Sequence, residues 1–445
     1  MPEQLQIMYI NRAIDEELLD WKEDIFKKPL LLRGARQVGK TNSVRELGKK
    51  FTYFLEVNFE EDPIVHNLFK GRLSPSEICE NLSLYYSIPI IEGETLLFFD
   101  EIQQSVSAIK SLRFFYEKMP KLHVIAAGSL LEFALENISS FAVGRVRSIF
   151  MYPLSFNEFM VGCGEKSLLI KKNTSSPDQP LAPLLHNKLL RYLRKFLILG
   201  GMPEVVSTYI QTKDFTRCQK VLDDLVYALN DDFVKYKKNI PVSRLKEVFD
   251  AVILQSGNKF VFSKAAIHSN HQQVKTALNL LIMAGLVIPV THTSANGLPM
   301  GAEVNPKKQK MLLFDTGIFQ RISQLEINKT LFSDDFSLVN KGNIAELFIG
   351  LEILKYQNCH QRNDLYYWHR EAHNSNAEID YLLAINNEIY PIEVKSGSRG
   401  AMQSMFLFLK EKNKQKGIRI SLEPFSTYNK IDVYPLYGVY NLMHQ

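Results

Sequence analysis

One short stretch, Gly34 to Thr41, constrains this chain more than any other part of its sequence. It reads Gly-Ala-Arg-Gln-Val-Gly-Lys-Thr and fits the phosphate-binding pattern G-x-x-x-x-G-K-S/T at every fixed position. The apolar run before it predicts a short buried strand, and the residues from Asn42 onward predict a helix. In this strand–loop–helix order, backbone N–H groups and the helix N-terminus can face one phosphate group.

The residues of this loop have distinct expected roles in holding a nucleotide. Glycines at positions 34 and 39 let the backbone bend so that its N–H groups point inward. Lys40 is expected to reach the β- and γ-phosphates, and the Thr41 hydroxyl is expected to bind Mg²⁺. The expected cofactors are therefore ATP and Mg²⁺. The predicted nucleotide-binding residues are Gly34, Ala35, Arg36, Gln37, Val38, Gly39, Lys40, Thr41 and Asn42.

A second motif places two acids directly after an apolar run. Residues 95–99 are followed by Asp100 and Glu101, as in a buried parallel strand that delivers acids to its carboxyl edge. We expect Asp100 to hold Mg²⁺ and Glu101 to act as the general base for the attacking water. Ser129 follows another expected strand. It is either a polar residue beside the γ-phosphate or an ordinary helix cap.

Two arginines, Arg145 and Arg147, precede a further expected strand over residues 148–154. An arginine at this place could stabilise a γ-phosphate, either in its own chain or in a neighbouring copy. Both could equally be ordinary solvated arginines.

Together these motifs resemble the AAA+ superfamily, in particular the archaeal-type ATPases. The resemblance implies an α/β P-loop domain with a parallel sheet, in which Lys40, Thr41, Asp100 and Glu101 bind and hydrolyse ATP. It also implies a polar sensor at Ser129 and a finger arginine at Arg145 or Arg147. The runs that carry it are Leu30–Thr41, Leu96–Gln103, Ala126–Leu131, Gly144–Phe159 and Gly200–Glu204.

The C-terminal part carries a different pattern, a predicted hairpin with charges on one face. Glu393 and Lys395 are two positions apart on one strand, and Asp380 can project to the same side from the partner strand. Two acids could hold Mg²⁺, and the lysine could stabilise the charge on a phosphate. The simpler alternative is a surface hairpin whose charges are solvated.

This hairpin resembles the core of the PD-(D/E)XK restriction-endonuclease-like fold, an α/β fold. The matching residues are Asp380, Glu393 and Lys395, and Glu346 is the match for the acid that the fold supplies from its first helix. The resemblance implies the fold more strongly than the nuclease activity, because a fold alone does not establish a function.

Between these parts, amphipathic patterns over residues 245–284 predict helices, and an expected hairpin follows them. This order predicts a winged helix-turn-helix, which could contact DNA or another protein. Its third helix would offer Gln272, Gln273, Lys275 and Asn279. The predicted domains are an AAA+ core at 1–165, a helical lid at 166–240, the winged helix at 241–325 and the nuclease-like domain at 326–445.

Composition sets wide limits on function. The net charge of +5 permits nucleic-acid binding without requiring it. The scattered cysteines and the acidic N-terminus lead us to expect a cytoplasmic protein that does not enter a membrane. The expected function is an ATP-driven conformational switch, with an ATP-gated Mg²⁺-dependent nuclease and a non-enzymatic adaptor as alternatives. DNA or RNA and a protein partner stay open, as does the oligomeric state.

Overall fold

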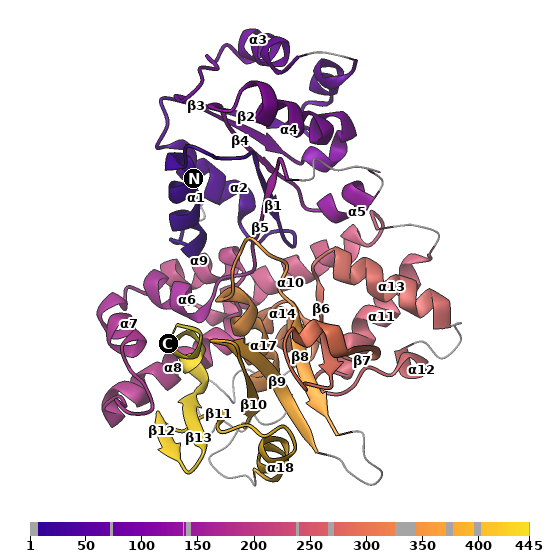
Figure 1. Ribbon diagram of the computed structural model, residues 1–445. Helices are drawn as coiled ribbons and strands as arrows, with labels where there is room; N and C mark the ends of the chain where they lie inside the picture. The colour runs from indigo at the N-terminus through magenta and orange to yellow at the C-terminus, as the bar shows by residue number, and fades with distance from the viewer. Residues whose placement is uncertain are drawn as a thin grey trace.

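The computed structural model describes residues 8–71, 74–136, 138, 144–236, 240–265, 271–324, 344–370, 377–395 and 402–444. Figure 1 shows an N-terminal α/β domain at one end, a layer of helices beside it, and a second sheet at the other end. The chain runs from the first sheet through the helices to the second sheet.

The N-terminal domain is built on a five-stranded parallel sheet in the order β2-β3-β4-β1-β5. Leu30 and Leu32 pack with residues of α1 and α2 on one face, and Leu31 packs with α3 and α4 on the other. This alternation follows from the two-residue period of a strand and explains why the central strands are buried on both faces. The strands are β1 (Leu30–Arg33), β2 (Tyr53–Asn58), β3 (Thr95–Asp100), β4 (His123–Ala127) and β5 (Arg147–Phe150). The helices are α1 (Ala13–Glu23), α2 (Lys40–Gly48), α3 (Pro75–Tyr86), α4 (Val106–Lys118) and α5 (Leu131–Glu136).

A group of helices follows the first sheet. Several have one apolar stripe, as in α8, whose buried residues recur at helical spacing from Leu189 to Phe196. Across the described residues, no helix is both long and apolar enough to cross a lipid bilayer. The helices are α6 (Phe156–Gly162), α7 (Lys166–Asn173), α8 (Pro183–Leu199), α9 (Pro203–Thr212) and α10 (Phe215–Asp232).

Three further helices lead into an antiparallel hairpin. The helix α11 (Val242–Leu254) packs against α13 (His271–Met283), and the short α12 (Phe262–Ala265) packs against both. The hairpin consists of β6 (Val287–Thr293) and β7 (Val304–Leu313), and α14 (Thr316–Ile322) follows it.

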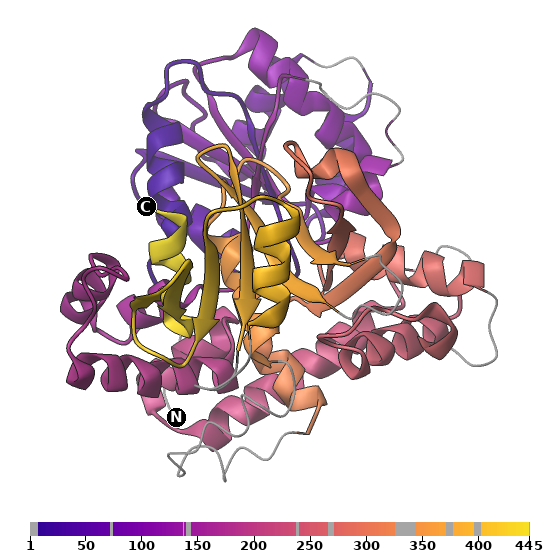
Figure 2. The ribbon, with the colours of Figure 1, turned by 60° about the horizontal axis from the view of Figure 1, so that its bottom comes forward.

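The hairpin and the C-terminal strands form one eight-stranded sheet in the order β12-β13-β11-β10-β9-β8-β6-β7, because β6 pairs in parallel with β8 (Figure 2). The predicted domain boundary at 325/326 separates β6 and β7 from the other strands of this one sheet. That boundary lies outside the described residues. The C-terminal elements are α17 (Ile344–Lys355), β8 (Leu365–His369), β9 (Glu378–Ile385), β10 (Glu388–Val394), α18 (Gln403–Glu411), β11 (Gly417–Ser421), β12 (Ser426–Tyr428), β13 (Ile431–Pro435) and α19 (Val439–Met443).

The C-terminal part is fixed to the N-terminal domain by buried polar contacts. Phe156 N, at the start of α6, donates to Glu352 Oε2 at 3.0 Å, and Lys355 Nζ donates to the Leu154 carbonyl at 2.9 Å. Glu352 is only 1% exposed and also pairs with Lys355 at 3.1 Å. Since a buried charge is costly without partners, these contacts favour one fixed arrangement of α17 on α6.

Candidate nucleotide site

The phosphate loop lies at the carboxyl end of β1, between the ends of β4 and β5. Gly34 has φ = +142°, and a Cβ there would lie 2.2 Å from the Met151 carbonyl oxygen, so only glycine fits. Gly39 has φ = +98° and caps the start of α2 in the left-handed region. The two glycines thus have the backbone roles that the sequence pattern predicts.

Lys40 is the first residue of α2, and its side chain folds back over the loop. Its Nζ donates to the carbonyls of Gly34 at 2.9 Å and Ala35 at 2.7 Å. Burial lowers the pKa of Lys40 to about 8, although the negative charges of Glu101 and Asp100 oppose this shift. The ammonium is therefore held by neutral oxygens, and an anionic ligand would stabilise its charge.

Thr41 and Asp100 meet as the sequence predicts for a metal-binding pair. Thr41 Oγ1 donates to Asp100 Oδ2 at 2.9 Å, and the backbone N–H of Glu101 donates to Asp100 Oδ1 at 3.0 Å. Burial raises the pKa of Asp100 to about 6, while the hydrogen bond from Thr41 opposes the rise. A carboxylate and a hydroxyl this close fit the oxygen ligands that Mg²⁺ prefers.

Glu101 is positioned by strained backbone and two polar neighbours. Its φ of +48° is uncommon for a residue with a side chain. Its Oε2 accepts hydrogen bonds from Gln103 Nε2 at 2.5 Å and from Ser129 Oγ at 3.3 Å. Gly128 leaves room for Gln103, because a Cβ there would lie 2.0 Å from Gln103 Oε1. The predicted base and the predicted polar sensor are therefore neighbours.

The acids of the C-terminal sheet gather around a buried lysine that the sequence analysis did not single out. Lys310, from β7, is 1% exposed, and its Nζ lies 2.8 Å from Glu346 Oε1 and 3.8 Å from Asp380 Oδ1. It also pairs with Glu378. Burial lowers the pKa of Lys310, but the three carboxylates outweigh burial and hold that pKa above its usual value. Burial and the charge of Asp380 together raise the pKa of Glu346 to about 7.

The other two predicted residues pair with each other beside this group. Lys395 Nζ lies 2.5 Å from Glu393 Oε1, and on the same strand Val394 N donates to Asp380 Oδ2 at 2.8 Å. A divalent cation needs several carboxylate oxygens free to face one point. Since Lys310 already lies among Glu346 and Asp380, the predicted metal site at Asp380 and Glu393 does not fit Mg²⁺ as it is built. A metal-binding role for Asp380 and Glu393 stays a prediction.

Comparison with known proteins agrees with the N-terminal geometry. A protein-family profile described as "AAA domain" matches residues 26–160. The chain contains an AAA domain. Two other profiles, described as "Domain of unknown function (DUF8612)" and "Domain of unknown function (DUF4143)", match residues 190–329 and 341–438.

The similar proteins differ in how much of this chain they cover. The uncharacterized protein MJ1544 of Methanocaldococcus jannaschii is 25% identical over 261 residues, which are 58% of this chain and 52% of that protein. The match thus spans about half of that relative's length.

The solved structures matched include the Orc1 protein of Aeropyrum pernix in complex with DNA, at 12% identity and a TM-score of 0.30, covering 76% of this chain and 97% of that one. A STAND protein with a tetratricopeptide repeat sensor from Pyrococcus horikoshii has 11% identity and a TM-score of 0.28, covering 80% and 49%. With scores this low, neither likeness says what this chain binds.

Arg12 is a residue of the site that the sequence motifs missed. It precedes α1 and is 9% exposed. Its Nη1 donates to the Val38 carbonyl at 3.0 Å, its Nη2 to the Tyr152 carbonyl at 2.7 Å, and its Nε pairs with Glu158 at 3.0 Å. Arg12 thus ties the phosphate loop to the segment after β5. No spacing rule links position 12 to the loop, so only the fold reveals this role.

The two candidate finger arginines lie away from the loop of their own chain. Arg147 begins β5 and is in register with Leu30, the first residue of β1, whereas the phosphate loop follows the last. Arg147 lies 3.5 Å from Asp24, and Arg145 pairs at 2.5 Å with Glu117, near the end of α4. Neither position supports contact with the phosphate loop of the same chain. A role toward a neighbouring copy stays a prediction.

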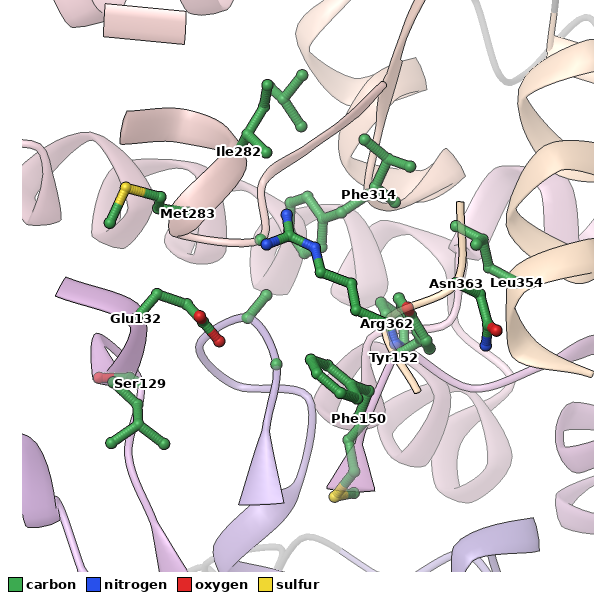
Figure 3. Close-up of a pocket in the computed structure, with 18 of the residues that line it drawn as sticks. Ser129, Glu132, Phe150, Tyr152, Ile282, Met283, Phe314, Leu354, Arg362 and Asn363 are labelled. Carbon is green, nitrogen blue, oxygen red and sulfur yellow. The ribbon is translucent and has the colours of Figure 1, made fainter. Parts of the chain in front are cut away.

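Two cavities flank the phosphate loop. One, of about 360 Å³, lies between the AAA domain, the end of α13, the hairpin and the loop before β8 (Figure 3). Its wall includes Gly34, Ala35 and Ser129. The other, of about 250 Å³, lies beside Gly39 and Asn42. The loop thus opens on one side toward Ser129 and on the other toward the first turn of α2.

The third helix of the predicted winged helix-turn-helix is α13, and the structure exposes the side that was expected to face a partner. All four residues proposed for contact are exposed: Gln272, Gln273, Lys275 and Asn279. One lysine in four residues makes this face only weakly attractive to phosphates. The winged-helix assignment and DNA contact therefore stay predictions.

Proposed function

We propose that this protein binds Mg²⁺ and ATP at residues 34–42 and hydrolyses ATP, with Glu101 as the general base. The observation that carries the proposal is the meeting of Lys40, Thr41, Asp100 and Glu101 at one loop of backbone amides. A buried ammonium, a hydroxyl–carboxylate pair and a second carboxylate are the set that phosphoryl transfer to water requires.

The two cavities suggest how the nucleotide lies. Ser129 lines the wider cavity and marks it as the side of the γ-phosphate, so the adenine would occupy the narrower cavity. That cavity is lined by Tyr9, Ile10 and Pro203 around Asn42, which gives the partly apolar walls that a purine needs.

In the proposed reaction, the oxygen of a water bonds to the γ-phosphorus while the bond to the β–γ bridging oxygen breaks. The bridging oxygen leaves with the electron pair on ADP, and Glu101 takes the proton of the water. Gln103 and Ser129 hold the Glu101 carboxylate for this step. Bound Mg²⁺, held by Thr41 and Asp100, would neutralise charge on the phosphates.

The loop also touches the parts of the chain that a switch would move. Arg36 pairs with Asp232 at the end of α10, and a Cβ at Gly285 would lie 3.2 Å from Ala35 N. A nucleotide that changes the loop would therefore change contacts with α10 and with the turn after α13. Such a switch works only if ATP and ADP stabilise different arrangements.

Three variants test the proposal by calorimetric titration with ATP and by phosphate release. Lys40→Ala should abolish hydrolysis and weaken ATP binding strongly. Glu101→Gln should still bind ATP but lower kcat by about 100-fold or more, the usual contribution of a general base. Lys50→Ala is the matched control, because Lys50 lies just after α2, is exposed, lines neither cavity and should leave both measurements unchanged.

Wild-type turnover in Lys40→Ala would contradict the proposal, and so would wild-type protein that shows no heat of ATP binding with Mg²⁺ present. Tight ATP binding without hydrolysis would instead favour the adaptor alternative. The nuclease alternative is less well supported than either, because Lys310 lies where a divalent cation would have to bind.

A further inference from the structure

An arginine of the C-terminal part extends into the wider cavity beside the phosphate loop. Arg362 lies in the loop before β8, and its side chain reaches into the middle of the cavity (Figure 3). It is far from Gly34 and Ala35 in sequence, yet all three line the same space. The cavity therefore brings a guanidinium into the space that Ser129 and the first two residues of the loop also line.

The segment that carries Arg362 is held in place by several hydrogen bonds. The Cys359 carbonyl accepts from Phe150 N at 2.8 Å, which ties the segment to the end of β5. His360 Nε2 lies 3.1 Å from Glu17 Oε2 on α1. Within the segment, Asn363 Nδ2 donates to the Asn358 carbonyl at 2.8 Å. Both external contacts are to the AAA domain, so the segment keeps its position relative to the phosphate loop.

The charges of the cavity wall leave Arg362 available for an anion. Arg362 is exposed, and among the residues that the structure describes it is the only cation in the wall and forms no ion pair. Glu132, across the cavity, already accepts from Arg33 Nε at 2.7 Å. Asp364 is exposed on the same segment. A phosphate at the loop would therefore meet a guanidinium that no described carboxylate holds.

We propose that Arg362 contacts the γ-phosphate of ATP bound to the same chain and stabilises the charge that grows there during hydrolysis. This proposal rests on the proposed ATPase function. Arg362 exchanges no proton, because a guanidinium stays charged throughout. The contact would also make the C-terminal part respond to the bound nucleotide, because ATP has a γ-phosphate that Arg362 can contact and ADP has none.

The test compares Arg362→Ala and Arg362→Lys with Arg370→Ala, in full-length protein. Arg370 is a matched control, because it also comes from the C-terminal part but pairs with Glu411 and lies outside this cavity. Arg362→Ala should lower kcat at least tenfold, since an arginine in this role contributes up to about 10³–10⁵-fold. It should weaken ATPγS binding while leaving ADP binding unchanged. Arg362→Lys should recover only part of each effect, because lysine loses the bidentate geometry.

The outcomes separate this proposal from the ATPase function on which it rests. If wild-type protein neither binds nor hydrolyses ATP, both proposals fall. If wild-type protein is active and Arg362→Ala matches it in kcat and in the ratio of ATPγS to ADP affinity, only the Arg362 proposal falls. Equal losses for ATPγS and ADP would also overturn it, because they would indicate a structural effect.

A mixing experiment distinguishes contact within the chain from contact between copies. Lys40→Ala protein retains Arg362, and Arg362→Ala protein retains the intact phosphate loop. Contact within one chain predicts that an equimolar mixture has only the sum of the two low activities. Recovery of hydrolysis above that sum would show that Arg362 acts on a neighbouring copy, and would overturn the proposal.

Discussion

Lys40 and Lys310 are both buried lysines with carboxylates nearby, but they are stabilised in opposite ways. Lys40 donates to two neutral carbonyls, and burial lowers its pKa to about 8. Lys310 lies among three carboxylates, which hold its pKa above the usual value despite burial. The charge of Lys40 is incompletely compensated, whereas that of Lys310 is compensated within the chain.

The partners of a buried cation distinguish a binding site from an internal ion network. A buried cation without an anionic partner is stabilised by a ligand that supplies the anion. The charge of Lys40 therefore favours phosphate binding at this loop. A buried cation with several carboxylates stabilises the fold and blocks a metal ion from the same oxygens. The same residue types therefore indicate chemistry in one region and structure in the other.

The largest expected effect is a difference in thermal stability between variants of Lys310 and Lys40. Lys310→Met leaves buried carboxylates without their cation, which typically costs about 3–5 kcal/mol. We expect thermal unfolding of this variant at a clearly lower temperature than wild type. Lys40→Met, the matched variant, should unfold near the wild-type temperature, because it removes a charge that burial disfavours. Equal unfolding temperatures for the two variants would contradict the comparison.

The change in unfolding temperature on adding Mn²⁺ tests the role of Lys310 in a second way. If Lys310 takes the place of a divalent cation, Mn²⁺ should raise the unfolding temperature of Lys310→Met and leave that of wild type unchanged. No response to Mn²⁺ in Lys310→Met would mean that the acids form an ion network without the geometry of a metal site.

The next effect concerns the pH dependence of ATP binding. The pKa of Lys40 is about 8 in the free protein, and bound phosphates favour the ammonium and raise that pKa. Above pH 8, binding should therefore take up a proton, and affinity should fall toward tenfold per pH unit. Below pH 7, Lys40 should contribute no pH dependence. Calorimetry in buffers with different ionisation heats measures the proton uptake.

Lys40→Arg serves as the control for this measurement, because arginine stays protonated across the range. Any pH dependence that comes from ATP or from other groups should persist in the variant. If wild type and Lys40→Arg respond to pH identically, the lowered pKa of Lys40 is not what controls binding.

The smallest effect tests the contact between the phosphate loop and the turn after α13. Gly285 has φ = +74°, and a Cβ there would approach Ala35 N at 3.2 Å. Gly285→Ala should cost about 1 kcal/mol of strain and weaken ATP binding several-fold. Gly297→Ala is the control, because a Cβ at Gly297 meets nothing within 4 Å. ATP affinity equal in both variants would show that this turn does not influence the loop.

The sequence determined the parts of the protein that depend on neighbours along the chain. The glycine pattern and the apolar run before it were enough to predict the phosphate loop, because backbone bending and strand burial are local properties. The acids after β3 were also predictable, because parallel strands bring their carboxyl ends to one edge of a sheet. The direction of Arg145 and Arg147 was not, because it depends on which end of the sheet they reach.

Only the tertiary structure decided what the buried charges do. Arg12, Lys310 and Arg362 lie far in sequence from the groups that they face, and no local pattern marks them. The electrostatic energy of a charge depends on the distance to other charges and on exclusion of water, and both are set by packing between distant segments. The sequence therefore determined where phosphate could bind, and the fold determined which cations stay free to meet it.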